Sequence, residues 1–337
     1  MPAGWPHHLA LGVADAPNDA AALRHHAPFD LRYQYLAGGV NTGSGWATWN
    51  PNGSFASLYV SESLRARIIP VLTYYQLLQS EPSSGSSESA RDVSNLQDPA
   101  TMSAYWADYE LMLRRVRSAA GNHLVVVHLE PDLWGYLEQA GDVGLARSLA
   151  ARFIALRNQL APNVALAYHL STWGTGEDPT YTKPSLAHMD VLAGRSAAFY
   201  ESLHAHFDLV FNDVTDRDAG YYLKVEGNPK TAWTAGDFVR HTRYIATFTR
   251  LTHTAVVYWQ LPLGNTTLNN TPTHYRDNRV QWWLANPGYA HLRAERAAGV
   301  IGLLFGGGAT GTTTPQTDGG LFFRLAASYL AHPLPLG

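Results

Sequence analysis

The stretch Leu124-Val-Val-Val-His-Leu-Glu-Pro131 shows the clearest strand pattern in the sequence. Its first four residues are apolar, and the valines among them are β-branched residues that favour strands. An apolar run without alternating polar residues is typical of a strand buried on both faces, as in a parallel sheet covered by helices. The segment therefore predicts a buried parallel sheet.

Seven other segments show a similar short apolar pattern, and helical patterns separate them. The clearest helix is expected from Pro99 to about Ala120, because Asp98 suits the N-cap and proline suits the first helical position. Eight buried strands with helices between them predict an α/β fold: a single (β/α)8 TIM barrel over residues 1–337, with extended loops at the carboxyl ends of the strands. The expected strands cover residues 9–15, 31–38, 68–77, 124–131, 163–171, 209–214, 255–262 and 299–307.

An open, doubly wound sheet is the alternative fold. No expected strand leads into a G-x-G-x-x-G turn or a G-x-x-x-x-G-K-[ST] loop, which argues against a nucleotide-binding sheet. Glycines 306 to 308 follow the last expected strand. They predict a flexible turn, and phosphate binding at that corner of a barrel is the alternative.

The composition excludes several classes of function. The chain has 337 residues, of which 46% are hydrophobic and 15% charged, and its net charge is −3. We therefore expect no binding to nucleic acid or to an anionic membrane, because a basic footprint is absent. The sequence contains no cysteine, which excludes disulfides, thiolate catalysis and cysteine-ligated metals. The first residues show no signal-peptide pattern.

Polar and aromatic residues gather where the expected strands end. In a barrel of this type these ends meet on one face, and catalytic groups lie there. The ends of the strands carry Asp15, Tyr75 and Gln76, His128 and Glu130, His169, Asp213 and Asp216, and Trp259 and Gln260.

Glu130 is the predicted general acid. It follows an apolar strand, so its carboxyl group is expected at the barrel mouth, partly shielded from water, where the pKa of a carboxylic acid rises. Because alternate strand residues share a face, His128 is expected beside it. An ion pair between Glu130 and Arg32 or Arg217 is the structural alternative.

The segment LVVVHLEPDLW, with its strand-four Glu-Pro followed by tryptophan, resembles the acid/base segment of (β/α)8 glycoside hydrolases of the cellulase superfamily. The resemblance implies that Glu130 is the proton donor and that a glutamate on strand seven is the nucleophile. The sequence departs from this family at two positions. Leu129 stands where the family has asparagine, and Gln260 stands where the nucleophile is expected.

A strand-six aspartate is the predicted replacement for the missing carboxylate. Asp213 is expected to act as the base of an inverting hydrolase, with Asp216 and Asp15 in reserve. Such an enzyme needs its base about 6.5–9.5 Å from the acid, which carboxylates two strands apart can satisfy. Helix capping, or pairing with Arg217, is the alternative role for these aspartates.

Aromatic and polar residues at the same end predict a sugar-binding surface. Flat aromatic rings stack on the C–H faces of sugars, and amide side chains bind hydroxyl groups. Packing in the core is the alternative role for each tryptophan. The predicted substrate-binding residues are Trp46, Trp49, Tyr75, Gln76, His128, Trp134, His169, Trp173, Trp259 and Gln260.

These observations predict an extracytoplasmic glycoside hydrolase of bacterial type that acts on a polysaccharide or oligosaccharide without a cofactor. Gln260 favours one alternative, a glycan-binding barrel that has lost its nucleophile. A second alternative is a metal-dependent sugar isomerase or hydrolase, in which four residues of strands four to six converge on a divalent ion. Those residues are His128, Glu130, His169 and Asp213.

Overall fold

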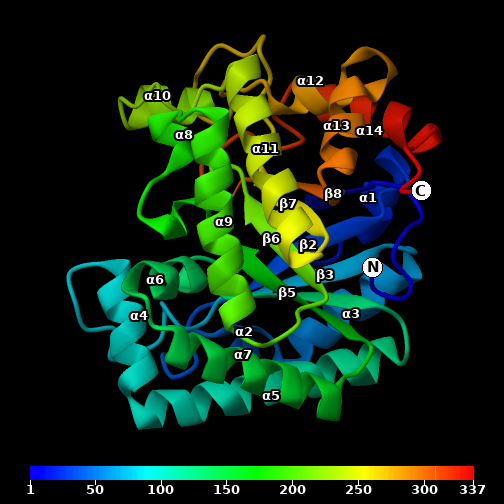
Figure 1. Cartoon of the computed structure of the whole chain (residues 1–337). Coiled ribbons are helices and arrows are strands. Elements are labelled where there is room, and N and C mark those ends of the chain that lie inside the picture. The colour runs from blue at the N-terminus through cyan, green and yellow to red at the C-terminus, as the bar shows by residue number, and fades with distance from the viewer. Residues whose placement is uncertain (308) are drawn as a thin grey trace.

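The computed structural model describes residues 1–307 and 309–337. Eight parallel strands pair in chain order and close into a barrel, because β1 also pairs with β8 (Figure 1). The predicted barrel and all eight predicted strands are confirmed, each slightly shorter than expected. The strands are β1 (Ala10–Ala14), β2 (Leu31–Leu36), β3 (Ile69–Tyr74), β4 (Val125–Leu129), β5 (Val164–Leu170), β6 (Leu209–Asp213), β7 (Val256–Leu261) and β8 (Val300–Phe305).

Helices surround the barrel, as Figure 1 shows. The predicted helix from Pro99 to Ala120 is confirmed as α5, and Asp98 caps it by accepting a hydrogen bond from the amide of Thr101 at 2.7 Å. The α-helices are α1 (Ala20–His26), α2 (Trp46–Trp49), α3 (Ser54–Arg65), α4 (Glu88–Gln97), α5 (Pro99–Ala120), α6 (Leu133–Ala140), α7 (Val143–Leu160), α8 (Pro179–Thr182), α9 (Leu186–Ser202), α10 (Ala219–Val225), α11 (Ala235–Thr252), α12 (Arg279–Leu284), α13 (Ala290–Ala297) and α14 (Leu321–Ala331). Three short 3-10 helices are η1 (Pro51–Gly53), η2 (Thr172–Thr175) and η3 (Pro287–Tyr289).

The strand residues form two packed layers. One set points outward and packs against the helices, and Leu129 and Tyr168 belong to it. The other set fills the barrel, and its members include Val126, Phe211 and Trp259. This division explains why the strands read as apolar along their whole length: both faces are covered.

The upper layer of the barrel interior is aromatic. The ring of His128 lies 4.6 Å from Trp259 and 4.7 Å from Phe211, measured between ring centroids. Trp259 also packs 6.1 Å from Tyr33. These residues close the barrel, so the space above them is a cavity with a floor and not a channel.

The backbone departs from regular strand geometry next to that space. Within β7 the pairing register with β8 shifts between Tyr258 and Leu261, and Gln260 has a φ of 55°. After β4, Glu130 and Asp132 have φ values of 42° and 73°. A positive φ at a residue other than glycine costs about 1–3 kcal/mol and is concentrated at functional sites. The ends of β4 and β7 therefore have the irregular backbone that is typical of functional sites.

No helix in the described parts of the chain is long and apolar enough to cross a membrane. Gly308, in the predicted glycine turn, lies outside the described residues.

Candidate functional site

A cavity of about 670 Å³ lies at the carboxyl ends of the strands. Residues from the ends of β2, β3, β4, β5, β6 and β7 and from the loops that follow them form its wall, so its position agrees with the rule for barrels of this type. Seven of the predicted site residues line it: Tyr75, His169, Trp173, Asp213, Asp216, Trp259 and Gln260.

A chain of polar side chains runs from the barrel interior to this cavity. Oδ1 of Asp213, at the end of β6, lies 3.3 Å from Nε2 of His169. Nδ1 of His169 lies 3.0 Å from Nε2 of His128, and Nδ1 of His128 lies 3.4 Å from Oγ1 of Thr73. Thr73, His128 and His169 are buried, whereas Asp213 is partly exposed to the cavity.

The effect of burial on the pKa of His128 indicates where the protons lie along this row of side chains. Because burial holds the pKa of His128 well below its usual value, that ring is neutral and carries one N–H. When His128 donates from Nε2 to Nδ1 of His169, the proton of His169 lies on Nε2 and faces the carboxylate of Asp213. In the opposite arrangement Nδ1 of His169 donates to His128, and Nε2 of His169 then carries a proton only if the ring is doubly protonated. Nε2 of His169 approaches Oδ1 of Asp213 at ion-pair distance, and neither atom makes a hydrogen bond within the described residues.

Asp132 is a second carboxyl group on the cavity wall. Burial raises its pKa to about 6, and the nearby carboxylate of Asp213 raises the pKa as well, whereas His169 lowers it. A carboxyl group that keeps its proton near pH 6 suits general-acid catalysis. Sequence reasoning did not select Asp132, although the residue stands only two positions after Glu130.

Aromatic rings form part of the wall. Tyr136 and Trp173 pack against each other with ring centroids 5.0 Å apart, and the hydroxyl of Tyr136 donates to Glu88 at 2.7 Å. On the floor, the side-chain amide of Gln260 donates to the hydroxyl of Tyr35. The bulge in β7 thus directs Gln260 into the cavity, where it offers an amide and no carboxylate.

Asp216 lies at the rim of the cavity, already engaged by two neighbours. One of its oxygens pairs with Arg217, and the other accepts a hydrogen bond from the hydroxyl of Tyr222. Both oxygens of Asp216 are thus engaged, whereas the carboxylate of Asp213 contacts only His169 among the described residues. The geometry therefore favours Asp213 over Asp216 as the base.

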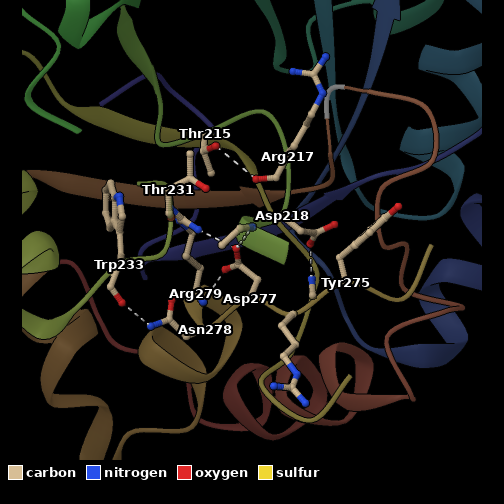
Figure 2. Close-up of polar contacts among 12 residues, drawn as sticks. Thr215, Arg217, Asp218, Thr231, Trp233, Tyr275, Asp277, Asn278 and Arg279 are labelled. Carbon is tan, nitrogen blue, oxygen red and sulfur yellow. Dashed lines mark hydrogen bonds and ion pairs between the residues drawn. The ribbon is translucent and has the colours of Figure 1, made fainter. Parts of the chain in front are cut away.

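A buried network behind the wall fixes the loops that carry these residues (Figure 2). Asp218 accepts hydrogen bonds at 2.8 Å from the amides of Gly264 and Thr313, which belong to the loops after β7 and β8. Asp277 binds the guanidinium of Arg279 at 2.7 Å, and Arg279 also donates to the carbonyl of Thr231 at 3.0 Å. The loops after β6, β7 and β8 are thus tied together, which sets the position of Thr231 on the cavity wall.

Glu130 is not where the sequence placed it. The positive φ at this residue breaks the alternation of the strand, so its carboxylate turns away from His128 and from the barrel interior. The carboxylate is buried and accepts hydrogen bonds from the amide of Gln76 at 3.1 Å and from the hydroxyl of Tyr105, on α5, at 2.6 Å. Glu130 is not among the residues that line the cavity. The alternative ion pair is also not formed, since Arg32 binds Asp15 and Glu62.

Several other predicted contact residues also lie off the cavity. Trp46 and Trp134 are fully buried, and their indole N–H groups donate to Asp108 and to the carbonyl of Leu129. Trp49 is 44% exposed but stands on the outer surface of its loop, where it donates to the carbonyl of Ser44. These tryptophans cap or pack loops, which is the alternative role that their sequence pattern allowed.

Three further predicted residues do not line the main cavity. Gln76 is fully buried, and its side-chain amide has no hydrogen-bond partner. His128 lies beneath His169. Asp15, the reserve base, lines a different cavity and is bound to Arg32 at 2.8 Å. None of these three side chains is therefore part of the wall of the main cavity.

The residues expected to bind a metal ion do not converge. His128 is engaged with His169 and Thr73, and Glu130 turns toward α5. Within residues 1–307 and 309–337, no group of three or more histidine, aspartate or glutamate side chains is arranged to hold a metal ion. The observed chemistry of the cavity is that of carboxylates, imidazole and aromatic rings.

The comparisons with known proteins show the fold. No protein-family model and no curated protein matches the sequence. Among solved structures, the GH53 catalytic domain of Ignisphaera aggregans superposes with a TM-score of 0.58 at 13% identity, over 97% of this chain and 98% of that domain. An exo-beta-1,4-mannosidase, Op5Man5 from Opitutaceae bacterium strain TAV5, gives a TM-score of 0.58 at 11% identity, over 97% of this chain but only 60% of its own length. The intracellular xylanase TsXylA of Thermoanaerobacterium saccharolyticum JW/SL-YS485 gives 0.51 at 11% identity, over 91% and 89% of the two chains.

Proposed function

We propose that the protein is a glycoside hydrolase in which Asp132 is the general acid and Asp213 is the general base. The observation that carries the proposal is that two carboxyl groups in different environments, Asp132 and Asp213, line the same cavity. Burial favours the protonated form of Asp132, whereas an imidazole faces Asp213. A carboxyl group that burial keeps protonated, next to a second carboxyl group in a different environment, is the usual mark of an acid and its base.

The proposed reaction is the hydrolysis of a bond between two sugars. Asp132 gives its proton to the oxygen of the leaving sugar, while Asp213 takes a proton from a water molecule that attacks the anomeric carbon. The C–O bond breaks, a new C–O bond forms to the water oxygen, and both sugars leave with hydroxyl groups. This route inverts the anomeric configuration, because the water attacks the face opposite the leaving group.

The cavity wall supports a sugar as the substrate. Trp173 and Tyr136 offer aromatic faces, and Gln260 offers an amide that can bind a hydroxyl group. The similarity of fold to a GH53 domain, a mannosidase and a xylanase supports the same class of substrate. We further propose that the protein acts outside the cytoplasm, with an extracellular polysaccharide or oligosaccharide as its substrate.

Asp132 replaces Glu130 in this proposal because an acid must reach the leaving oxygen within hydrogen-bond distance. Asp132 lines the cavity, while Glu130 is enclosed by Tyr105 and by the chain at Gln76. In this proposal the acid is therefore Asp132, two residues after Glu130, and not the residue that the resemblance to the cellulase superfamily implies.

The test is the release of sugars from a panel of polysaccharides by the wild-type protein and by Asp132→Asn and Asp213→Asn. Each substitution keeps the size of the side chain but removes the carboxyl group, and each is expected to lower the rate at least about a hundredfold. Glu201→Gln, at an exposed position on α9, is the matched control and should keep full activity. NMR of the first product then reports the anomeric configuration.

A glycan-binding barrel is the second candidate, and Gln260 favours it, since an amide stands at the position of the nucleophile in the superfamily that the sequence resembles. Saturable glycan binding by the wild-type protein, with no product from any bound glycan, would select this function over hydrolysis.

A further inference from the structure

We propose that the cavity selects a positively charged sugar, an amino sugar whose nitrogen is not acetylated. This inference rests on the proposed function and specifies its substrate. Two kinds of observation support it: the imbalance of charge on the cavity wall, and buried polar groups on that wall that have no partner.

Acidic groups outnumber basic groups on the cavity wall. Among the described residues that line it, the basic side chains are Arg217 and His169. Arg217 is already paired with Asp216, and His169 faces Asp213. Among the described residues, five carboxyl groups line the same space: Glu88, Asp132, Asp178, Asp213 and Asp216. Glu88 lies 3.9 Å from the guanidinium of Arg91, so Asp132 and Asp178 are the carboxyl groups on this wall without an ion-pair partner in the described parts of the chain. An excess of acidic over basic groups on a cavity wall favours ligands of positive charge.

Asp178 is the carboxyl group best placed to receive a cation. It follows η2 and caps α8 by accepting a hydrogen bond from the amide of Thr180 at 2.9 Å. Among the ion pairs of the described residues, none involves Asp178. Burial raises the pKa of this carboxyl group, and the charge of Asp213 adds to the effect. A bound ammonium group would relieve both penalties, because it supplies the missing counter-charge.

Buried polar atoms on the same wall have no partner within the protein. Nε1 of Trp259 and Oγ1 of Thr231 make no hydrogen bond, although the two residues are only 2% and 1% exposed. Both residues line the cavity. Leaving such groups unpaired is costly unless a ligand or water binds them. An indole N–H and a hydroxyl group suit the hydroxyl groups of a sugar, so they indicate a polar ligand in addition to the charge.

Aromatic rings complete the match to an amino sugar. The hydroxyl of Tyr136 donates to Glu88, the ring of Trp173 packs against Tyr136, and both rings line the cavity with Asp178. The face of an aromatic ring attracts an ammonium ion as well as the C–H groups of a sugar. A uronic acid or a sulfated sugar would instead meet several carboxylates, and an N-acetyl sugar would bring no charge to balance them.

The first experiment measures binding to the full chain by calorimetry, with glucosamine, galactosamine, their N-acetyl forms, glucose and glucuronic acid as ligands. The amino sugars are expected to bind about tenfold more tightly than glucose and the N-acetyl forms, which is the ratio that one charge-assisted contact supplies. Added salt should reduce this preference, because it screens charge. Equal affinities, or tighter binding of the N-acetyl sugars or glucuronic acid, would overturn the inference.

A variant separates charge from packing. Asp178→Asn keeps the hydrogen bond that caps α8, since asparagine is also a favourable N-cap, but it removes the charge. The preference for amino sugars over glucose should fall severalfold while the affinity for glucose stays the same. Glu201→Gln is the control for removing a carboxylate elsewhere and should leave the preference unchanged. An unchanged preference in Asp178→Asn would show that Asp178 does not bind the cation.

Hydrolysis assays distinguish this inference from the proposed function. Cleavage of chitosan oligomers in preference to chitin oligomers would support both. Cleavage of neutral glycans with no preference for amino sugars would keep the proposed function and reject the charge selection. Tight binding of amino sugars without cleavage of any glycan would keep the charge selection and reject the proposed hydrolase.

Discussion

Nε2 of His169 lies 3.3 Å from Oδ1 of Asp213, and the opposite ring nitrogen of His169 contacts His128. The two histidines come from the neighbouring strands β4 and β5, and Asp213 ends β6. Three adjacent strands thus build one polar chain, and its final member is the carboxylate that we propose as the base. This row of polar side chains is the clearest reason to assign Asp213 a chemical role.

Substitution at His128 tests whether the chain positions the base. His128→Asn is expected to lower kcat about tenfold with little change in KM, because His128 does not touch the cavity but holds the tautomer of His169. Nitrogen NMR of the histidine rings should show His169 protonated on Nε2 in the wild type and as a mixture of tautomers in the variant. Thr73→Val, at the far end of the chain, is the milder companion variant. An unchanged His169 spectrum in His128→Asn would contradict the positioning role.

The pH dependence of the rate tests Asp132. Its pKa is raised to about 6, and a general acid must be protonated to act. The rate constant kcat/KM is therefore expected to fall as the pH rises through about 6. The measurement is kcat/KM from pH 4 to 9 on a substrate that does not titrate in this range. The low residual rate of Asp132→Asn should lack this decline, and a decline that persists in the variant would assign it to another group.

Glu130 is expected to affect stability and not catalysis. Burial raises its pKa from 4.5 to about 7, so the folded state holds the proton more tightly than the unfolded state. The stability associated with that proton is complete below about pH 4.5 and is lost as the pH rises through 7, a change of about 3 kcal/mol. Urea unfolding at pH 5 and pH 8 measures the loss. Glu130→Gln should show a smaller loss than the wild type and should retain sugar release, whereas a loss of turnover with an unchanged fold would return the acid role to Glu130.

The buried pair of Asp277 and Arg279 is expected to support the loops at the cavity. Both side chains are fully buried, and the pair links the loop after β7 to Thr231 (Figure 2). Asp277→Ala leaves the guanidinium of Arg279 without its counter-charge and should lower the free energy of unfolding by about 3–5 kcal/mol. Thermal and urea unfolding provide the measurement. The variant Asp190→Ala, which breaks an exposed pair with Arg243, should cost no more than about 1 kcal/mol.

The sequence by itself determined the barrel. The apolar strands and the Asp98-Pro99 helix start are local signals, because burial on both faces and capping depend on residues close together in the chain. The sequence also placed polar residues at the carboxyl ends of the strands, and Asp213, His169 and Gln260 do meet there.

Only the tertiary structure decided which of these side chains face the cavity. Positive φ values at Glu130, Asp132 and Gln260 reverse or redirect side chains that regular alternation would have placed differently. Nothing in the local sequence predicts such angles, because they are held by contacts with distant residues such as Tyr105 and Tyr35. Asp178 and Thr231 reach the same wall from the loops after β5 and β6, and Arg279, after β7, holds the carbonyl of Thr231. Local sequence patterns thus determine the fold, while the chemistry of the site depends on long-range packing that fixes the backbone at a few residues.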